Sequence, residues 1–494
     1  MANWENVYDG SPDVKEKFNT TDYMKSLVMK KATLGWLMVL LSVNLAFAGV
    51  VPVEDARLIA KNLYFERVQA FRPVKMSMIV ITDEFSVGMA GEPLYYVFNI
   101  GNNEGFVLVA ADDLVYPVLG YAFTGRFAGN DLHPSISAQM ELYEAQIVHA
   151  REAEPFMIPE IAEVWDKYRR EQFTPAKDIQ TVGPICKTTW DQGGFYNDSC
   201  PGGSVTGCVA TAMAQVMKAF NWPPKGKGSY SYTHPSYGLQ SANFGITTYK
   251  WSSMPNVVSA PNAPVAQLMY HCGVSVDMSY SPGGSGASMF RAKDALYMYF
   301  NYSPFIRTAT KSAYTDIYWK ILIRAQHMNG RPVMYSGPGH AFVCDGFQYP
   351  DHFHFNWGWG GSYDGYFYLT SLRPGGYNFT NGQDAIVDAY PDSASRFDAY
   401  GEGGIWNLSE GEQVQINPNP SEDGMVNLIM LAGYSGEVLV SVSDIKGAVK
   451  DQFVIQKQHE WSAEKLNLSH LGSGFYLVTI QMGNQTKVCK LLIQ

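Results

Sequence analysis

The spacing of apolar residues in the first third of the chain predicts a mixed α/β unit. Residues 53–70 and 136–152 carry apolar side chains at helical intervals. Between them, 95–100 and 105–110 are short apolar, β-branched runs separated by Gly101-Asn102-Asn103, a pattern typical of a β-hairpin. This stretch has no cysteine, and its two histidines have no obvious partner, so it contains no plausible nucleophile.

A helix is predicted to begin near Cys208, after glycine-rich coil, and to end before Pro223-Pro224. Ser204 and Thr206 are candidate N-caps. Apolar residues then recur on one helical face, at Val209, Met213, Val216 and Phe220. Cys208 therefore lies in the first turn, where the helix dipole favours an anion and lowers a thiol pKa. The alternative is a buried core cysteine, the commoner fate of a free cysteine.

A β-hairpin is predicted further along the chain. Residues 340–346 form an apolar run after a Gly-Pro-Gly turn, residues 348–351 turn, and residues 353–357 read as the return strand. Antiparallel pairing about that turn places His340 opposite residues 356–359.

This hairpin suggests a nucleophilic site, because a thiolate nucleophile needs an imidazole partner. The Asn356 carbonyl can hold the His340 ring in the useful tautomer, and Trp357 can shield that bond from water. The side chain of Gln192, with the backbone N–H of Cys208, can hold a developing oxyanion. The alternatives are an ordinary strand histidine and a tight aromatic turn.

Two further histidines, His352 and His354, share one face of the predicted return strand. Metal sites use such pairs, but no set of cysteines or carboxylates at ligand spacing accompanies them. We therefore expect no metal ion, and the chemistry of a thiolate and an imidazole requires no organic cofactor.

The C-terminal segment follows a polar linker and alternates apolar with polar positions. Val438, Val440 and Val442 alternate with their neighbours, and residues 475–482 form another strand. Gly483-Asn484 then turns the chain into a last strand. About 80 residues of short strands and turns predict a small β-sandwich.

Composition narrows the functional classes. The 494 residues suggest about three domains, and a hydrophobic fraction of 46% excludes disorder of the whole chain. The net charge of −10 argues against a nucleic-acid binder and offers no basic patch for anionic membranes. Six cysteines are too few for a disulfide scaffold, although Cys186 and Cys200 are a candidate pair in an oxidising compartment.

The N-terminus reads as a secretory signal. Lys30-Lys31 precedes an apolar run at 34–45, and Ala46-Phe47-Ala48 follows as a cleavage pattern. The alternative is a membrane anchor; however, Gly49 and Pro52 interrupt the apolar stretch, so we expect cleavage that leaves no stable membrane span. The first 23 residues fit no signal pattern, and two later methionines, Met24 and Met29, are more natural starts.

Together these motifs resemble the streptopain family of papain-like cysteine peptidases. The resemblance covers about residues 188–372. The matching strings are Gly207–Ala212 followed by Gln215, Cys272–Met278, Gly339–Val343 with Asp345-Gly346, Asn356–Gly361 and Asp364–Phe367. The resemblance implies an α+β catalytic domain in which a helix carries the cysteine and a β-sheet carries the histidine.

The resemblance also implies residue roles. Cys208 would be the nucleophile, His340 the general base and acid, Asn356 the orienting residue, Gln192 an oxyanion donor and Trp357 the indole that covers the site. Two segments would border the substrate cleft, the first with Ser281, Gly283 and Gly284, and the second with Met334, Ser336 and Gly339.

The flanking segments resemble known accessory domains. Residues 106–113 and 117–121 are similar to the inhibitory pro-domain of the family, and the start Asn417-Pro418-Asn419-Pro420 is similar to that of a type IX secretion sorting domain. We therefore expect five segments: an upstream segment with the signal peptide (1–48), an α/β pro-domain with a cleavable linker (49–177), a papain-like peptidase domain (178–390), a linker (391–412) and a C-terminal β-sandwich sorting domain (413–494).

The expected function is that of a secreted or surface-exposed bacterial cysteine endopeptidase, made as a zymogen and acting on proteins and peptides. Its expected partners are its own pro-domain, as an intramolecular inhibitor, and the secretion machinery. The alternatives are an acyl-transferring relative, such as an amidase or transpeptidase, and a catalytically inactive surface binding module.

Overall fold

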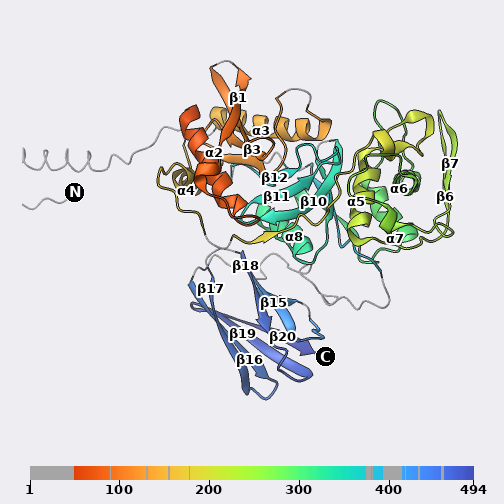
Figure 1. Cartoon of the computed structure of the whole chain (residues 1–494). Coiled ribbons are helices and arrows are strands. Elements are labelled where there is room, and N and C mark those ends of the chain that lie inside the picture. Colours follow the sequence, from red (N-terminus) through yellow and green to blue (C-terminus); the bar gives the residue numbers. More distant parts are fainter. Residues whose placement is uncertain are drawn as a thin grey trace, which may run out of the picture. The chain divides into compact units, whose positions relative to one another are not determined.

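The computed structural model arranges the chain in three successive groups of helices and strands (Figure 1). It describes residues 49–494 except 90, 130–131, 154–155, 177–178, 338, 374–379, 381, 393–413, 418, 432–433, 435 and 458–460. The expected signal peptide and the candidate start sites therefore lie outside the described residues. Within the described part, no helix is both long and apolar enough to cross a membrane.

The first group, called the N-terminal unit below, is an antiparallel sheet with helices packed against it. Its main elements are α2 (Val53–Val68), β1 (Ile81–Met89), β2 (Glu92–Ile100), β3 (Gly105–Ala110), β4 (Val118–Ala122), α3 (Pro134–Ala153) and α4 (Pro159–Tyr168). The predicted hairpin is confirmed, because β2 pairs with β3 with Ile100 opposite Gly105. Both predicted helices are confirmed as α2 and α3. Strand β1 was not predicted, since it is mostly exposed and polar.

The second group combines a helical half with a sheet. Its helices are α5 (Cys208–Phe220), α6 (Ala263–Ser275), α7 (Met289–Phe300) and α8 (Asp316–Met328). Its strands are β5 (Thr181–Val182), β6 (Tyr230–His234), β7 (Gly238–Ala242), β8 (Arg307–Thr310), β9 (Val333–Gly337), β10 (His340–Gln348), β11 (His352–Asn356), β12 (Gly365–Tyr368) and β13 (Asp384–Val387). Helix α5 packs against α6 on one side and β10 on the other, so one core joins the helices to the sheet.

A single antiparallel sheet runs through both groups, in the order β1-β2-β3-β4-β12-β11-β10-β9-β13-β8. The junction is the pair β4–β12, where Tyr121 lies opposite Tyr366 and Gly120 opposite Phe367. Gly120 is required at this point, because a Cβ there would lie 2.6 Å from the Phe367 ring. The N-terminal unit therefore extends the sheet that carries His340.

The third group is a β-sandwich with its own core. Its strands are β14 (Val414–Asn417), β15 (Met425–Leu431), β16 (Gly436–Asp444), β17 (Val449–Lys457), β18 (Trp461–Asn467), β19 (Gly474–Met482) and β20 (Gln485–Ile493). They form two sheets, β14-β15-β18 and β17-β16-β19-β20. The predicted inward face is confirmed, since Val438, Val440 and Val442 are fully buried.

Candidate active site

Cys208 is the first residue of α5, as the sequence pattern predicts. The N-cap is Gly207 with φ +85°, and a Cβ at this position would lie 2.8 Å from both the Ser285 carbonyl and the Met278 sulfur. The prediction of Ser204 or Thr206 as N-cap is wrong, because the helix has no side-chain cap. Only glycine fits at this N-cap position. Because glycine has no side chain to cap the helix, the amides of the first turn remain available to the thiol.

The Cys208 thiol is half-buried and lies against backbone amides. The amides of Ala341, Val209 and Cys208 itself favour its thiolate, but burial outweighs them and raises its pKa. The expected lowering of the thiol pKa at the helix N-terminus is therefore wrong for this chain, in which the N-terminal unit is present. The amide of Ala341 belongs to the residue after His340, so the nucleophile helix and the histidine strand meet here.

His340 begins β10 and pairs with Gly337 of β9. The ring is half-buried, and burial lowers its pKa. The imidazole and the thiol of Cys208 therefore both favour their neutral forms. Such a pair is not the thiolate–imidazolium pair that the chemistry needs.

The predicted hairpin is confirmed as β10–β11, which turn at Tyr349-Pro350. The last pair of its ladder is Val343 opposite Asn356. The Phe342 and Trp357 rings then lie 4.6 Å apart, centre to centre. His340 lies three residues before Val343 and so has no paired residue on β11.

The Asn356 side chain is buried and makes three hydrogen bonds within the described residues. Its Oδ1 accepts hydrogen bonds from Gln215 Nε2 at 2.9 Å and from the Gly358 amide at 3.1 Å. Its Nδ2 donates to the Thr188 carbonyl at 2.7 Å. None of the bonds found for Asn356 in the described residues goes to His340, so its role in orienting the imidazole stays a prediction.

Trp357 is buried in a loop that closes on itself. Its indole N–H donates to the Tyr363 carbonyl at 3.0 Å, and its backbone N–H donates to Asp364 Oδ1 at 2.9 Å. Burial raises the pKa of the Asp364 carboxyl to about 7. This loop fixes the indole beside Phe342 of β10, although shielding of a His340 bond by Trp357 stays a prediction.

Gln192 lies close in space to the entry of α5. The Thr206 amide donates to the Gln192 carbonyl at 2.9 Å, and the Gln192 amide donates to Asp191 Oδ1. Its side-chain amide makes no hydrogen bond among the described residues and is therefore available to a ligand. The oxyanion role of Gln192 with the Cys208 amide stays a prediction.

The predicted cleft residues fall into two groups. The loop with Ser281, Gly283 and Gly284 ends at Ser285, whose carbonyl lies against Gly207, so this loop does border the nucleophile. Gly339 is exposed and Ser336 is half-buried.

The placement of Met334 at the cleft is wrong, because its side chain is 0% exposed and lies in the core.

The cysteines and the two strand histidines were also singled out in the sequence. None of the six cysteines, all of which lie in the described residues, forms a disulfide, so Cys186 and Cys200 are not paired. The two strand histidines are engaged by the protein, His352 through the Val118 carbonyl and His354 through Asp345.

One contact beside the site was missed by the sequence analysis. The His133 ring of the N-terminal unit stacks on Trp359, with centroids 4.4 Å apart and planes 9° apart. The Trp359 indole also donates to the Ser135 hydroxyl at 3.3 Å. These partners are more than 220 residues apart, and no local pattern connects them.

Comparison with known proteins agrees with this arrangement. Residues 190–367 match the model of the peptidase C10 family, residues 48–147 match the Spi protease inhibitor, and residues 415–494 match a secretion system C-terminal sorting domain.

Relatives of known identity extend the comparison. The thiol protease/hemagglutinin PrtT of Porphyromonas gingivalis is 34% identical over 397 residues, 73% of this chain, which spans 44% of the length of that protein. Streptopain of Streptococcus pyogenes is 31% identical over 340 residues, 60% of this chain and 80% of streptopain.

A solved fragment of Prevotella intermedia prointerpain A is 31% identical. The likeness covers 63% of this chain and 99% of that fragment, with a TM-score of 0.52. This likeness and the helices and sheets of the chain confirm the expected α+β papain-like fold. The chain therefore belongs to the peptidase C10 family of streptopain-like cysteine peptidases.

Proposed function

We propose that this chain is a secreted cysteine endopeptidase made as a zymogen, which cleaves peptide bonds in proteins through a thioester on Cys208. The observation that carries the proposal is the meeting of the uncapped start of α5 with the start of β10. It brings the Cys208 thiol against the amide that follows His340.

The mechanism follows from this arrangement. His340 takes the thiol proton, and the Cys208 sulfur bonds to the substrate carbonyl carbon. Gln192 and the Cys208 amide receive the oxyanion, and one such donor is worth about 10²- to 10³-fold in rate. The carbon–nitrogen bond then breaks as His340 protonates the leaving amine. Water, deprotonated by His340, hydrolyses the thioester and the thiol is restored.

The N-terminal unit is the inhibitory pro-domain in this proposal, and is called the pro-domain from here on. Besides the β4–β12 junction, two of its contacts with the peptidase domain bear on latency. At the first, His133 covers Trp359, next to the loop that holds Trp357. Helix α3 also contacts β10, which begins at His340, and its neighbour β9. This cover supports latency, because it places pro-domain residues beside the loop of Trp357 and against the strand that begins at His340.

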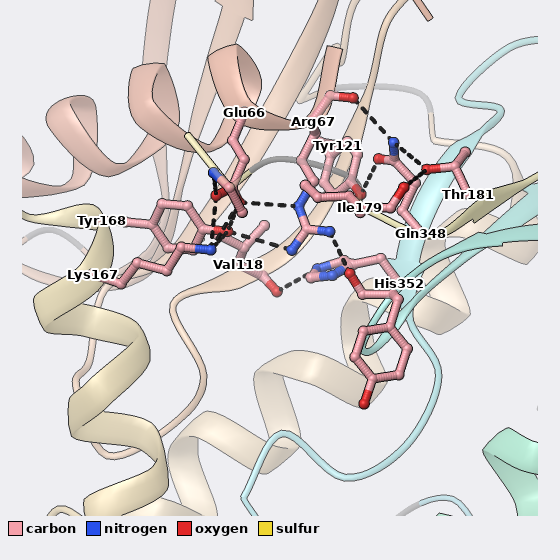
Figure 2. A network of polar contacts seen from close by, with 12 residues as sticks. Glu66, Arg67, Val118, Tyr121, Lys167, Tyr168, Ile179, Thr181, Gln348 and His352 are labelled. Carbon is pink, nitrogen blue, oxygen red and sulfur yellow. Dashed lines mark hydrogen bonds and ion pairs between the residues drawn. The ribbon is translucent and has the colours of Figure 1, made fainter. Parts of the chain in front are cut away.

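The second contact is a buried polar network at the far end of β10 (Figure 2). Arg67 of α2 lies at its centre and donates to the Tyr349 carbonyl at 2.6 Å. The Arg67 carbonyl accepts from Gln348 Nε2, and Tyr121 donates to Gln348 Oε1 at 2.7 Å. These bonds join β10 to the pro-domain. The other strand of the hairpin, β11, is joined to it as well, through the contact between His352 and the Val118 carbonyl.

The Arg67 guanidinium stays charged in this buried setting. Burial opposes its charge, but Tyr168, Tyr121 and Glu66 raise its pKa. Glu66 is buried too; burial favours its protonation, yet Arg67 and Lys167 hold the pKa of this carboxyl below its ordinary value. A network of paired charges is specific in geometry and is strongly weakened by loss of one member.

The segment that links the two domains is held by the same network. Asn62 donates to the carbonyls of Tyr168 and Arg170, and Glu66 accepts from the Ala176 amide. Strand β5 then pairs with β10. We propose that maturation cuts between Tyr168 and Gly183, after this segment detaches.

Export is the third part of the proposal. The match of residues 415–494 to a secretion sorting domain supports export of the chain. We propose that residues 30–48 act as the signal peptide and that the β-sandwich directs type IX secretion. Substrates are proteins and peptides with an apolar residue two positions before the cleaved bond, the preference expected of a papain-like cleft.

The test compares Cys208→Ala with the wild-type chain and with Cys489→Ala, a control in the β-sandwich. Cys208→Ala should stay folded by circular dichroism, hydrolyse no casein and keep the pro-domain in mass spectra. The wild type and the control should both lose it and become active. Retention of more than a few per cent of wild-type turnover by folded Cys208→Ala would remove Cys208 as nucleophile.

A further inference from the structure

Gln215 is a fully buried polar residue on the helix that carries the nucleophile. It lies seven residues after Cys208, about two turns along α5, and its side chain is 0% exposed. Its Nε2 donates to Asn356 Oδ1 at 2.9 Å. Its Oε1 accepts from the Thr188 hydroxyl at 2.9 Å and from the Trp190 amide at 3.4 Å.

These bonds close a ring of three residues, in which Thr188 takes part with both its hydroxyl and its backbone carbonyl. Gln215 bonds to Asn356 and to the Thr188 hydroxyl, and Asn356 Nδ2 bonds to the Thr188 carbonyl at 2.7 Å. The second lone pair of Asn356 Oδ1 accepts from the Gly358 amide. Since a carbonyl oxygen has two lone pairs, the orientation of the Asn356 carboxamide is fully determined.

The ring joins three segments that carry the chemistry. Asn356 is followed by Trp357, Thr188 leads to Gln192 four residues on, and Gln215 is fixed to the helix of Cys208. These segments are also closely packed: a Cβ on Gly358 would lie 3.2 Å from Thr211 on the same helix. The loop and α5 are therefore in close contact at this point, and the Gln215 amide lies beside it, because the same Cβ would be 3.8 Å from Gln215 Nε2.

We propose that Gln215 is a positioning residue for the peptidase reaction. It touches no reacting atom and acts through Asn356 and Thr188, which it holds at fixed distances from α5. It thereby sets the Trp357 loop and the Gln192 segment around the Cys208 sulfur. The position requires one donor and an acceptor for two N–H or O–H groups, which an amide supplies at every pH and a carboxyl supplies only when it is protonated.

The inference rests on the proposed function, but the two are tested by different measurements. Absence of peptidase activity in the wild-type chain would contradict the proposed function. The role of Gln215 is tested by the ratio of variant to wild-type turnover. The variants are Gln215→Met, which keeps the volume and removes the bonds, and Gln215→Glu, which removes the donor. Each is made in the full chain and matured by the same treatment as the wild type.

The matched control is Gln326→Met. Gln326 is also fully buried on a helix of this domain, α8, and its amide bonds to Asp388 rather than to the site. It should lose a similar amount of thermal stability. Variants are compared at a temperature at which circular dichroism shows each to be folded.

We expect Gln215→Met to lower kcat by about 10- to 100-fold, the usual effect of removing a supporting hydrogen bond behind a catalytic group. KM should change less than about threefold, because the residue does not contact substrate. Gln326→Met should keep kcat within about twofold of the wild type. The carboxyl that Gln215→Glu introduces can again donate to Asn356 once it is protonated, so activity of this variant relative to wild type should rise as the pH falls.

Equal kcat in Gln215→Met and Gln326→Met would overturn the proposal, as would a Gln215→Glu pH profile identical to that of the wild type. Thr188→Val is the variant to use if the Gln215 variants fail to fold. It removes only the hydroxyl bond to Oε1, and we expect about a 3- to 10-fold loss of kcat. Unchanged kcat in folded Thr188→Val would likewise overturn the proposal.

Discussion

Replacing Arg67 by methionine should loosen the pro-domain from the peptidase domain. Arg67 donates to the Tyr349 carbonyl across the interface and to the Tyr168 hydroxyl within the pro-domain. Methionine keeps much of the apolar stem but none of these bonds. The Tyr349 carbonyl then loses a charged donor, and Glu66 loses one of its two cationic neighbours.

The magnitude follows from these contacts. A hydrogen bond to a charged group contributes about 1.5–3 kcal/mol, and a buried acceptor left without its partner costs about 1–3 kcal/mol. Removal of a buried charge also removes its desolvation cost, so we take a net loss of about 2–3 kcal/mol. At 1.4 kcal/mol for each factor of ten, the detached population rises about 30- to 140-fold.

The assay uses the full chain with Cys208→Ala, which we expect not to process itself. A trace of mature wild-type enzyme is added, and loss of the intact chain is followed by electrophoresis. Cutting between Tyr168 and Gly183 requires detachment of a segment that is paired with β10 and bonded to Asn62. The rate therefore follows the detached population when reclosing is faster than cleavage.

Arg57→Met is the matched control. Arg57 lies on the same helix and forms a partly exposed ion pair with Glu84 inside the pro-domain. Such surface pairs are worth about 0–1 kcal/mol, so the cutting rate should rise less than about fivefold. Equal rates for Arg67→Met and Arg57→Met would refute the view that Arg67 holds the pro-domain in place.

Four further predictions follow. Because Asp364 has a raised pKa of about 7, the folded chain holds a proton that the unfolded chain releases near pH 4, and stability falls as the pH rises from about 4 to about 7. Asp364→Asn should remove this decline and raise the melting temperature at pH 8 by about 4 °C or more; a parallel pH profile of Tm would contradict this. Gly207→Ala should lower both Tm and turnover, because its Cβ meets the Ser285 carbonyl, whereas Gly203→Ala, also at positive φ but in open space, should lose only about 1 kcal/mol. A chain ending at Asp392, whose amide bonds to the Asn301 carbonyl, should keep full peptidase activity but fail to be exported, and an inactive purified fragment would show that the β-sandwich supports the site. The pKa of Glu66 is lowered, so its stabilisation of the pro-domain is present above its ordinary pKa and is lost as the pH falls through the lower folded value; the cutting assay should therefore accelerate below about pH 4 in the parent chain and less so in Glu66→Gln.

The elements that carry the site could be predicted because their signals are local. One apolar helical face and two following prolines mark the helix of Cys208. A turn between two apolar runs marks the hairpin of His340. In both cases the interactions that form the element lie within about 20 residues, so the printed sequence contains them.

The remainder depends on contacts that no local pattern contains. Met334 lies on a strand whose first three residues are all buried, so alternation could not tell which side chains border the cleft. The direction of the Cys208 pKa shift was mispredicted because the amides at a helix N-terminus are only one influence on a thiol, and burial, which raises the pKa, is the larger one. Likewise, His133 meets Trp359 only after the sheet has formed.

The shared sheet has a consequence for the mature enzyme. While the pro-domain is attached, β12 is an interior strand between β11 and β4. When the pro-domain leaves, β12 (Gly365–Tyr368) becomes an edge strand whose backbone N–H and C=O groups on that side have no partner strand. The Tyr366 ring also loses the Tyr121 ring on which it stacks. Such an edge is a template onto which another extended chain can add. Because β12 has only four residues, the edge that maturation exposes is short, which limits the pairing of other chains with it.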